Sequence, residues 1–178
     1  VIGGAIDQPT SFYFQNSTSS FTKKSFPFSK SHSKYEDMDM ILEDFDKDGD
    51  LDLYVVSGGN EFEPYSPILK DRIYINDGSG NFKYSENSLP NNYSSGMRVS
   101  GEDFDKDGDI DLFVGGRVVP GTYPLPADSF LLVNESNGNE IKFVNADFSV
   151  FPFRDIGLVT SSVWVDYNND SWKDLIVV

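Results

Sequence analysis

The sequence predicts an all-β protein built from a repeated unit of about 60 residues. The first observation is an acidic loop, DFDKDGDLDLYV at residues 44–55, which returns as DFDKDGDIDLFV at residues 103–114 with two conservative changes. A weaker third copy, DYNNDSWKDLIV, occupies residues 166–177. The second observation is that no stretch has a convincing apolar period of 3.6 residues, so helix should be scarce. The third is composition, because frequent Phe, Tyr, Gly and Asn favour strands joined by tight turns.

The strands of one unit follow in order along residues 36–90. MDMILEDF alternates apolar and polar residues up to the acidic loop, and DLDLYVV leaves the loop as a second, half-buried strand. RIYIN predicts a third strand, NDGSG a hairpin turn and NFKYSE a fourth strand. The strand–Asn–turn–Phe pattern recurs, at residues 12–21, 73–82 and 131–143. Four antiparallel strands per unit predict the blade of a β-propeller.

This pattern divides the chain of 178 residues, which we expect to be a single partial propeller domain (1–178). Residues 1–30 should supply the last three strands of one blade, and residues 157–178 the first two strands of another. Residues 36–90 and 96–148 should each form a full blade. About three blades are too few to close a ring, which typically needs 4 to 8. We therefore expect an open arc, completed by the missing remainder of a longer protein or by self-association.

The charge of the chain excludes several classes of partner. A net charge of -15 repels nucleic acid phosphates and anionic lipids, and favours cations. The absence of cysteine excludes disulfides and thiolate metal sites. No apolar run approaches the length of a membrane span. We expect no nucleic acid partner and no membrane span.

The acidic loops have the pattern of an oxygen-ligand metal site. Carboxylates at loop positions 1, 3, 5 and 9 can converge around a glycine turn, and such crowding is costly without a cation. Calcium suits this site because it accepts six to eight flexible oxygen ligands, whereas zinc prefers His or Cys. The expected side-chain ligands are Asp44, Asp46, Asp48 and Asp52 in the first loop, Asp103, Asp105, Asp107 and Asp111 in the second, and Asp166, Asn168, Asp170 and Asp174 in the third.

Two alternatives and two refinements bear on these sites. An EF-hand is excluded, because position 12 is valine instead of glutamate and strands flank the loop. We expect the backbone carbonyl at position 7 (Asp50, Asp109, Trp172) to contribute, with the side chains of Asp50 and Asp109 pointing outward. The third loop should bind more weakly, since it has one carboxylate fewer and Ser171 in place of glycine. The competing interpretation is an acidic surface turn that binds nothing.

The loop core D-x-D-x-D-G-x-x-D-L in DFDKDGDLDLYV resembles the FG-GAP or VCBS-type repeat. That repeat builds the propeller of integrin alpha subunits and of many bacterial exported proteins. IYINDGSGNF is similar to the strand–turn–strand of bacterial proteins in the ASPIC/UnbV, cartilage-acidic-protein-like group. The resemblance covers nearly the whole chain. It implies that the loop side chains named above bind Ca²⁺ between the first and second strands of a blade, and that the protein is extracellular, at the cell surface or periplasmic.

We expect no catalysis, because no nucleophile motif or unclaimed carboxylate pair is recognisable, and His32 is expected to be an exposed loop residue. Two long connections, residues 57–71 and 115–129, should emerge on the same face. Tyr65, Arg117 and Tyr123 there could form a binding surface, or the connections could cap the blades and bury their aromatics. The expected function is therefore calcium-stabilised recognition of a protein or glycan. The alternative is an accessory domain of a secreted enzyme that acts on polysaccharide.

Overall fold

The computed structural model describes residues 1–16, 18–138, 140–147 and 149–178, and confirms the all-β class. One four-stranded antiparallel sheet contains β3 (Asp37–Glu43), β4 (Asp52–Ser57), β5 (Arg72–Ile75) and β6 (Lys83–Ser85) in that order. A second contains β7 (Gly96–Glu102), β8 (Asp111–Gly116), β9 (Phe130–Asn134) and β10 (Phe143–Asn145). In the described residues, the helical assignment is the 3₁₀ turn η1 (Pro67–Leu69).

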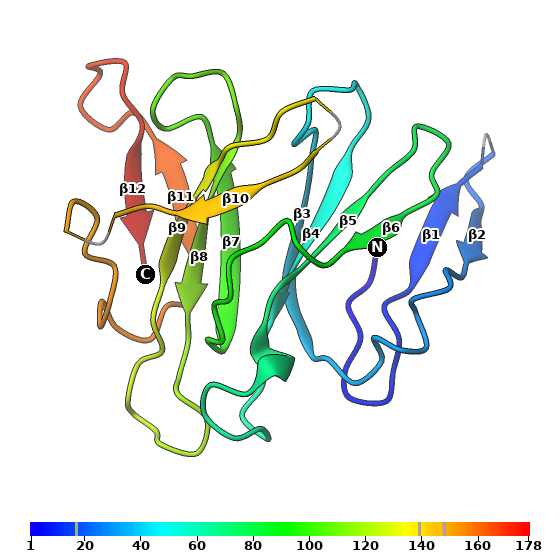
Figure 1. Ribbon diagram of the computed structural model, residues 1–178, viewed down its shortest axis with the longest axis horizontal. Coiled ribbons are helices and arrows are strands. Elements are labelled where there is room, and N and C mark those ends of the chain that lie inside the picture. Colours follow the sequence, from blue (N-terminus) through cyan, green and yellow to red (C-terminus); the bar gives the residue numbers. More distant parts are fainter. Residues whose placement is uncertain (17, 139, 148) are drawn as a thin grey trace.

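Two smaller sheets flank this pair. β1 (Phe12–Gln15) pairs with β2 (Phe21–Lys24), and β11 (Ser162–Val165) pairs with β12 (Asp174–Val177). We expected three strands within residues 1–30; the described part of this range contains β1, β2 and a bridge between Ile2 and Ser11. Figure 1 shows the sheets side by side in an open array, with β11–β12 at one end and β1–β2 at the other. This arrangement is consistent with part of a propeller.

The second strand of each four-stranded sheet lies deeper than expected. Every residue of β4 and of β8 is buried, although the alternation of DLDLYVV predicted a half-buried strand. The reason is that each sheet packs between two others, so both faces of its central strands are covered. Leu53 and Val55 share a core cluster with Phe12 on one side of β4, whereas Tyr54 and Val56 belong to the core on the other side.

Apolar side chains fill the space between neighbouring sheets. Val99 and Leu112 of the second four-stranded sheet join the core that it shares with the first. On its other face, Phe113 and Leu131 pack against residues of the β11–β12 segment such as Trp164. Because burial of apolar surface is the dominant favourable term in folding, these layers fix how one sheet sits on the next.

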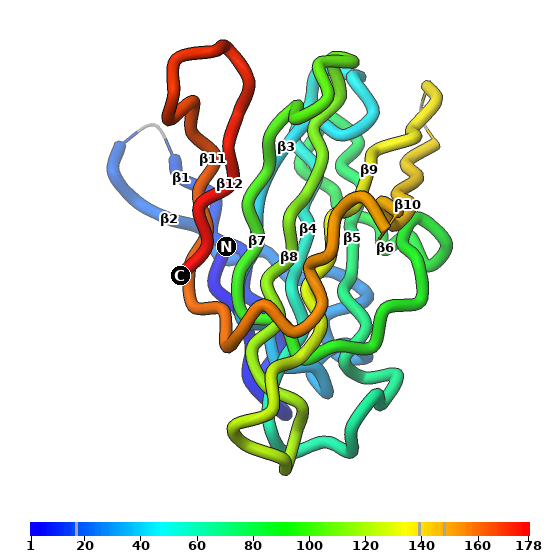
Figure 2. Tube along the Cα trace, turned by 90° about the vertical axis from the view of Figure 1, so that its left-hand side faces the viewer, coloured from blue at the N-terminus to red at the C-terminus, as the bar shows by residue number. Residues whose placement is uncertain are grey.

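The connections separate onto two edges of the molecule. The acidic turns β3–β4, β7–β8 and β11–β12 lie at the upper edge in Figure 1 and again in Figure 2. The long connections β4–β5 and β8–β9 lie at the opposite edge in both views, which confirms that they share a face. The amide of Gly121 donates to Asn60 Oδ1 (2.9 Å), so the two connections touch.

A buried polar network attaches the N-terminal segment to the first four-stranded sheet. Arg72 and Asp37 form an ion pair in which both side chains are 1% exposed. The Asp37 carboxylate also accepts hydrogen bonds from the Gly4 amide (2.7 Å) and the Thr10 hydroxyl. The guanidinium of Arg72 lies over the Tyr35 ring (4.2 Å).

His32 belongs to this network, and the expectation that it is an exposed loop residue is wrong. Its Nδ1 lies 2.8 Å from the hydroxyl of Tyr74, and its ring packs edge-on against Tyr84. Burial, followed by the charges of Arg72 and Lys34, lowers the pKa of His32 to about 4. The neutral imidazole is therefore the stable form at neutral pH.

Candidate metal centre

Each acidic loop is a tight turn closed by its own carboxylates. In the first loop, Asp44 accepts hydrogen bonds from the amides of Asp48 (3.1 Å) and Gly49 (3.0 Å). Lys47 and Gly49, at positions 4 and 6, have positive φ (61° and 95°). Only glycine adopts such φ values without steric cost, which explains the glycine at position 6.

The same turn recurs in the other two loops. Gly108 donates to Asp103 (3.1 Å), as Ser171 donates to Asp166 (2.9 Å). Positive φ recurs at both positions, at Lys106, Gly108, Asn169 and Ser171. Ser171 adopts φ 73° with a side chain present, so the third loop keeps the shape of the first two at a cost in strain.

The turn brings some of the expected ligands together. One carboxylate oxygen each from Asp44, Asp46 and Asp48 lie within 4.8 Å of one another. In the second loop, the oxygens of Asp103, Asp105 and Asp111 gather within the same distance. Asp52 lies outside the first group and Asp107 outside the second.

The third loop holds its polar side chains in a similar turn. The amide of Asp170 donates to Asp166 Oδ1 (3.1 Å) and Asn168 Oδ1 (2.9 Å), and Asp174 accepts from the amide of Tyr167 (3.0 Å). Among the described residues, no third group of three His, Cys, Asp or Glu ligand atoms gathers as closely as the two above. The amide oxygen of Asn168 replaces a carboxylate here, as the sequence indicates.

Several carboxylate oxygens of the first two loops have no hydrogen-bond partner although they are buried. They are Asp46 Oδ2, Asp50 Oδ1, Asp103 Oδ1 and Asp111 Oδ2. Burial raises the pKa of Asp46, and the neighbouring Asp48 carboxylate raises it further. A buried carboxylate oxygen without a donor is costly, and a cation is the natural partner for it. The residues present therefore fit an oxygen-ligated metal ion.

The position-9 aspartates are the most buried of the set. Asp52 and Asp111 are 1% and 0% exposed, and burial raises the pKa of each to about 7. Each accepts a hydrogen bond from the amide of an asparagine at the end of the third strand of its sheet, Asn76 just after β5 (2.9 Å) or Asn134 as the last residue of β9 (2.8 Å). One oxygen of each is thereby fixed in place.

Sequence reasoning did not connect these asparagines to the loops. The side-chain amide of Asn76 donates to Leu51 O (3.2 Å), and that of Asn134 donates to Ile110 O (3.3 Å) and to Phe45 O (3.0 Å). The signal in the sequence that could have found them is that an asparagine recurs at the end of each third strand. Their contact with the loops depends on the pairing of β4 with β5 and of β8 with β9, which the sequence does not show directly.

No side chain at position 7 belongs to the gathered oxygens of its own loop, although the Asp50 amide donates to Asp48 Oδ1 (3.1 Å) and Asp50 Oδ1 is buried. Asp109 pairs with Lys47 of the preceding loop (2.6 Å), as expected for a side chain that points outward. Asp50 lies beside the β5–β6 turn, where a Cβ at Gly78 would come within 3.2 Å of its Oδ2. The Trp172 side chain is half exposed. The contribution of the three backbone carbonyls stays a prediction.

Comparison with known protein families finds a match for the region that contains the first two acidic loops. The model of the FG-GAP-like repeat matches residues 44–114, from the start of the first acidic loop to the middle of β8. Residues 44–114 therefore carry an FG-GAP-like repeat. No curated protein matches the chain.

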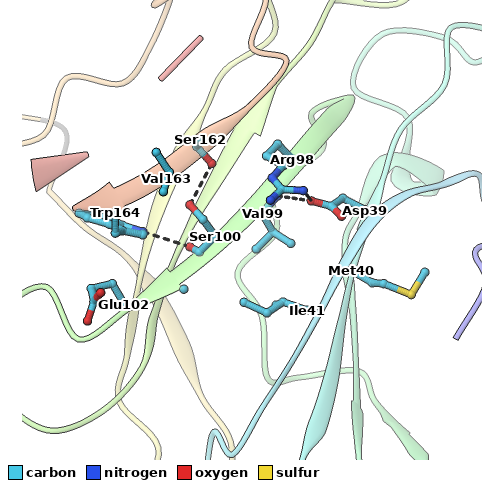
Figure 3. A pocket seen from close by; sticks show the side chains of 11 residues that line it. Asp39, Met40, Ile41, Arg98, Val99, Ser100, Glu102, Ser162, Val163 and Trp164 are labelled. Carbon is cyan, nitrogen blue, oxygen red and sulfur yellow. Dashed lines mark hydrogen bonds and ion pairs between the residues drawn. The ribbon is translucent and has the colours of Figure 1, made fainter. Parts of the chain in front are cut away.

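Strands β3, β7 and β11 line a groove of about 300 Å³. Figure 3 shows Arg98 of β7 directed at Asp39 of β3 (3.2 Å), and the hydroxyl of Ser100 beside that of Ser162 on β11 (2.9 Å). The indole Nε1 of Trp164 donates to Ser100 O (3.3 Å). These contacts join three successive sheets, so we assign the groove a structural role.

The edge opposite the acidic loops, formed by the long connections, carries exposed aromatic side chains. Tyr65 and Tyr123 of the long connections are 66% and 78% exposed, so the alternative that these connections bury their aromatics is wrong for both. A cleft of about 220 Å³ lies beside Tyr65, lined also by Tyr93, Asn91, Asn92, Asp128 and Arg154. Arg117 donates instead to Leu158 O (2.8 Å). Within the described residues, no helix has the length and apolar character needed to cross a bilayer.

Proposed function

We propose that this protein is the cation-stabilised part of a non-catalytic β-propeller, and that calcium is the cation. The observation that carries the proposal is the set of buried carboxylate oxygens without partners in two nearly identical loops. Calcium is favoured because the ligands are oxygens only and calcium accepts a flexible set of six to eight oxygen ligands. Magnesium demands stricter octahedral geometry and retains its waters.

Ion binding at each loop would raise the free energy of unfolding of the protein. The gathered carboxylates repel one another, and a divalent ion replaces this repulsion with attraction. A site filled at 100 times its Kd adds about 2.7 kcal/mol of stability. With about 2.1 cal/mol/K of unfolding entropy per residue, this raises the Tm of a 178-residue chain by about 7 °C per site.

The test is a thermal melt in excess EDTA, in millimolar calcium and in millimolar magnesium. We expect calcium to raise the Tm well above the values in EDTA and in magnesium. Asp46→Asn and Asp105→Asn should each remove about half of the calcium effect. Glu86→Gln makes the same charge change at an exposed residue outside the loops and should leave the effect intact. Equal Tm values in all three conditions would rule out the calcium proposal.

We further propose that the protein is exported and that the edge opposite the loops recognises a protein or glycan. Exposed Tyr65 beside amide and carboxylate groups suits a sugar, which stacks on an aromatic ring and hydrogen-bonds through its hydroxyls. Extracellular modules often bind calcium with Kd near 10⁻⁴ to 10⁻³ M, which agrees with a calcium-rich exterior.

A glycan array tests recognition. Tyr65→Ala should abolish retention of any bound sugar. Tyr167→Ala should not, because Tyr167 is at least as exposed as Tyr65 but lies in the third acidic loop. Release of cleaved sugar by the intact protein would favour the alternative of an accessory domain in a polysaccharide-acting enzyme. Failure to retain any glycan would leave a protein partner as the target to be sought.

A further inference from the structure

Lys47 reaches out of its own acidic loop and into the next one. Its Nζ lies 2.6 Å from Asp109 Oδ1, the position-7 carboxylate of the second loop. A Cβ at Gly108 would lie 3.6 Å from the same Nζ. The hydrogen bond to Asp109 raises the pKa of Lys47, and the charges that raise it further are those of Asp109, Asp107 and Asp103. These carboxylates all belong to the second loop.

The equivalent lysine of the second loop repeats the contact with different chemistry. Lys106 Nζ lies 3.8 Å from the ring centroid of Trp172, which occupies position 7 of the third loop. Hydrogen bonds, first among them that from the Trp172 amide, lower the pKa of Asp170, and the nearby charge of Lys106 lowers it further. In both cases a position-4 lysine with positive φ meets the position-7 residue of the following loop.

This geometry has an electrostatic consequence for the second loop. The positive φ of Lys47 is part of the closed turn, so the turn itself aims the side chain at the neighbouring sheet. The lysine charge offsets part of the acidic field of residues 103–111 before any ion binds. When a divalent ion enters that loop, the same charge repels it.

We propose that Lys47 is a cross-blade counter-charge that lowers the affinity of the second acidic loop for divalent cations, and that Lys106 does the same for the third. The inference rests on the proposed calcium function and adds a regulator outside each affected loop. Because the lysine is half exposed, its effect is a surface electrostatic one and weakens with ionic strength.

The test uses Gly49 and Gly108, the position-6 glycines, as reporters of their own loops. Calcium is titrated into ¹⁵N-glycine-labelled protein, and the two amide signals give a Kd for each loop. Lys47→Met removes the charge at similar length and should tighten the Kd reported by Gly108 roughly three- to tenfold at low salt. Lys47→Arg keeps the charge and should leave it within about twofold. The gain in Lys47→Met should shrink in concentrated KCl.

The outcomes separate this inference from the calcium function. An unchanged or weaker Kd at Gly108 in Lys47→Met, with normal calcium binding in the unmodified protein, would overturn the counter-charge role alone. An equal tightening at Gly49 and Gly108 would also overturn it, because the lysine would then act on its own loop as much as on the next. No response of either glycine in the unmodified protein would overturn the calcium proposal, and this inference with it.

Discussion

The Arg72–Asp37 pair offers the sharpest test of how the N-terminal segment is attached. We expect Arg72→Met to be strongly destabilising, because it leaves the Asp37 carboxylate buried without its cation. Removing one partner of a buried ion pair typically costs about 3 to 5 kcal/mol. The pair fits this class, since both side chains are 1% exposed.

The expected change in melting temperature follows from the size of the chain. With about 2.1 cal/mol/K of unfolding entropy per residue, a loss of this size over 178 residues lowers the Tm by about 8 to 13 °C. Asp37→Asn should cost a similar amount, because it leaves the guanidinium unpaired. The double variant should be much less destabilised than the sum of the two, since neither charge is then buried alone.

The assay is thermal and urea unfolding of the three variants at pH 7 in a fixed calcium concentration. The coupling free energy comes from the double-mutant cycle. A loss below about 1 kcal/mol for Arg72→Met, or additive losses in the double variant, would refute the reasoning. Either result would mean that water reaches the pair and that it behaves like an exposed ion pair.

Three further predictions concern the loops and the polar network. Asn134→Ala should cost about 1 to 3 kcal/mol in urea unfolding and weaken calcium binding, because it leaves the buried carbonyl of Phe45 without its donor. His32 has a folded-state pKa of about 4, below its unfolded value near 6.5, so its contribution to stability is complete above pH 6.5 and is lost as the pH falls toward 4. The stability difference between the unmodified protein and His32→Gln should shrink or reverse over that range, and a constant difference would contradict it. Ser171→Gly should raise the free energy of unfolding by about 0.4 to 1 kcal/mol, and so raise the Tm slightly, because Ser171 holds a positive φ. A lower Tm would mean that the serine side chain contributes more stability than its backbone strain costs.

The acidic turn could be predicted because its information is local. Asp44 bonds to amides only four and five residues ahead, so the D-x-D-x-D-G pattern by itself specifies the turn. The strand pattern likewise specified the order of strands in β3–β6 and β7–β10. The depth of β4 could not be predicted from alternation alone, since it depends on a second sheet covering the outer face.

The contacts that join one unit to the next could not be predicted from the sequence. Asn134 reaches Phe45, 89 residues away, and Lys47 reaches Asp109 in the next loop. His32 was misjudged for the same reason, because its neighbours Tyr74 and Tyr84 come from a sheet that follows it in the chain. Nothing in the local pattern of SKSHSK indicates that partner.

The sequence by itself determined the all-β class, the repeat and the shape of the acidic loops, because these follow from periodicity and from hydrogen bonds that span a few residues. The tertiary structure decided which carboxylates gather, which oxygens are left buried without a partner and which lysine faces which loop. These properties depend on how one sheet stacks on the next, and stacking is set by apolar side chains from segments that are distant in the chain.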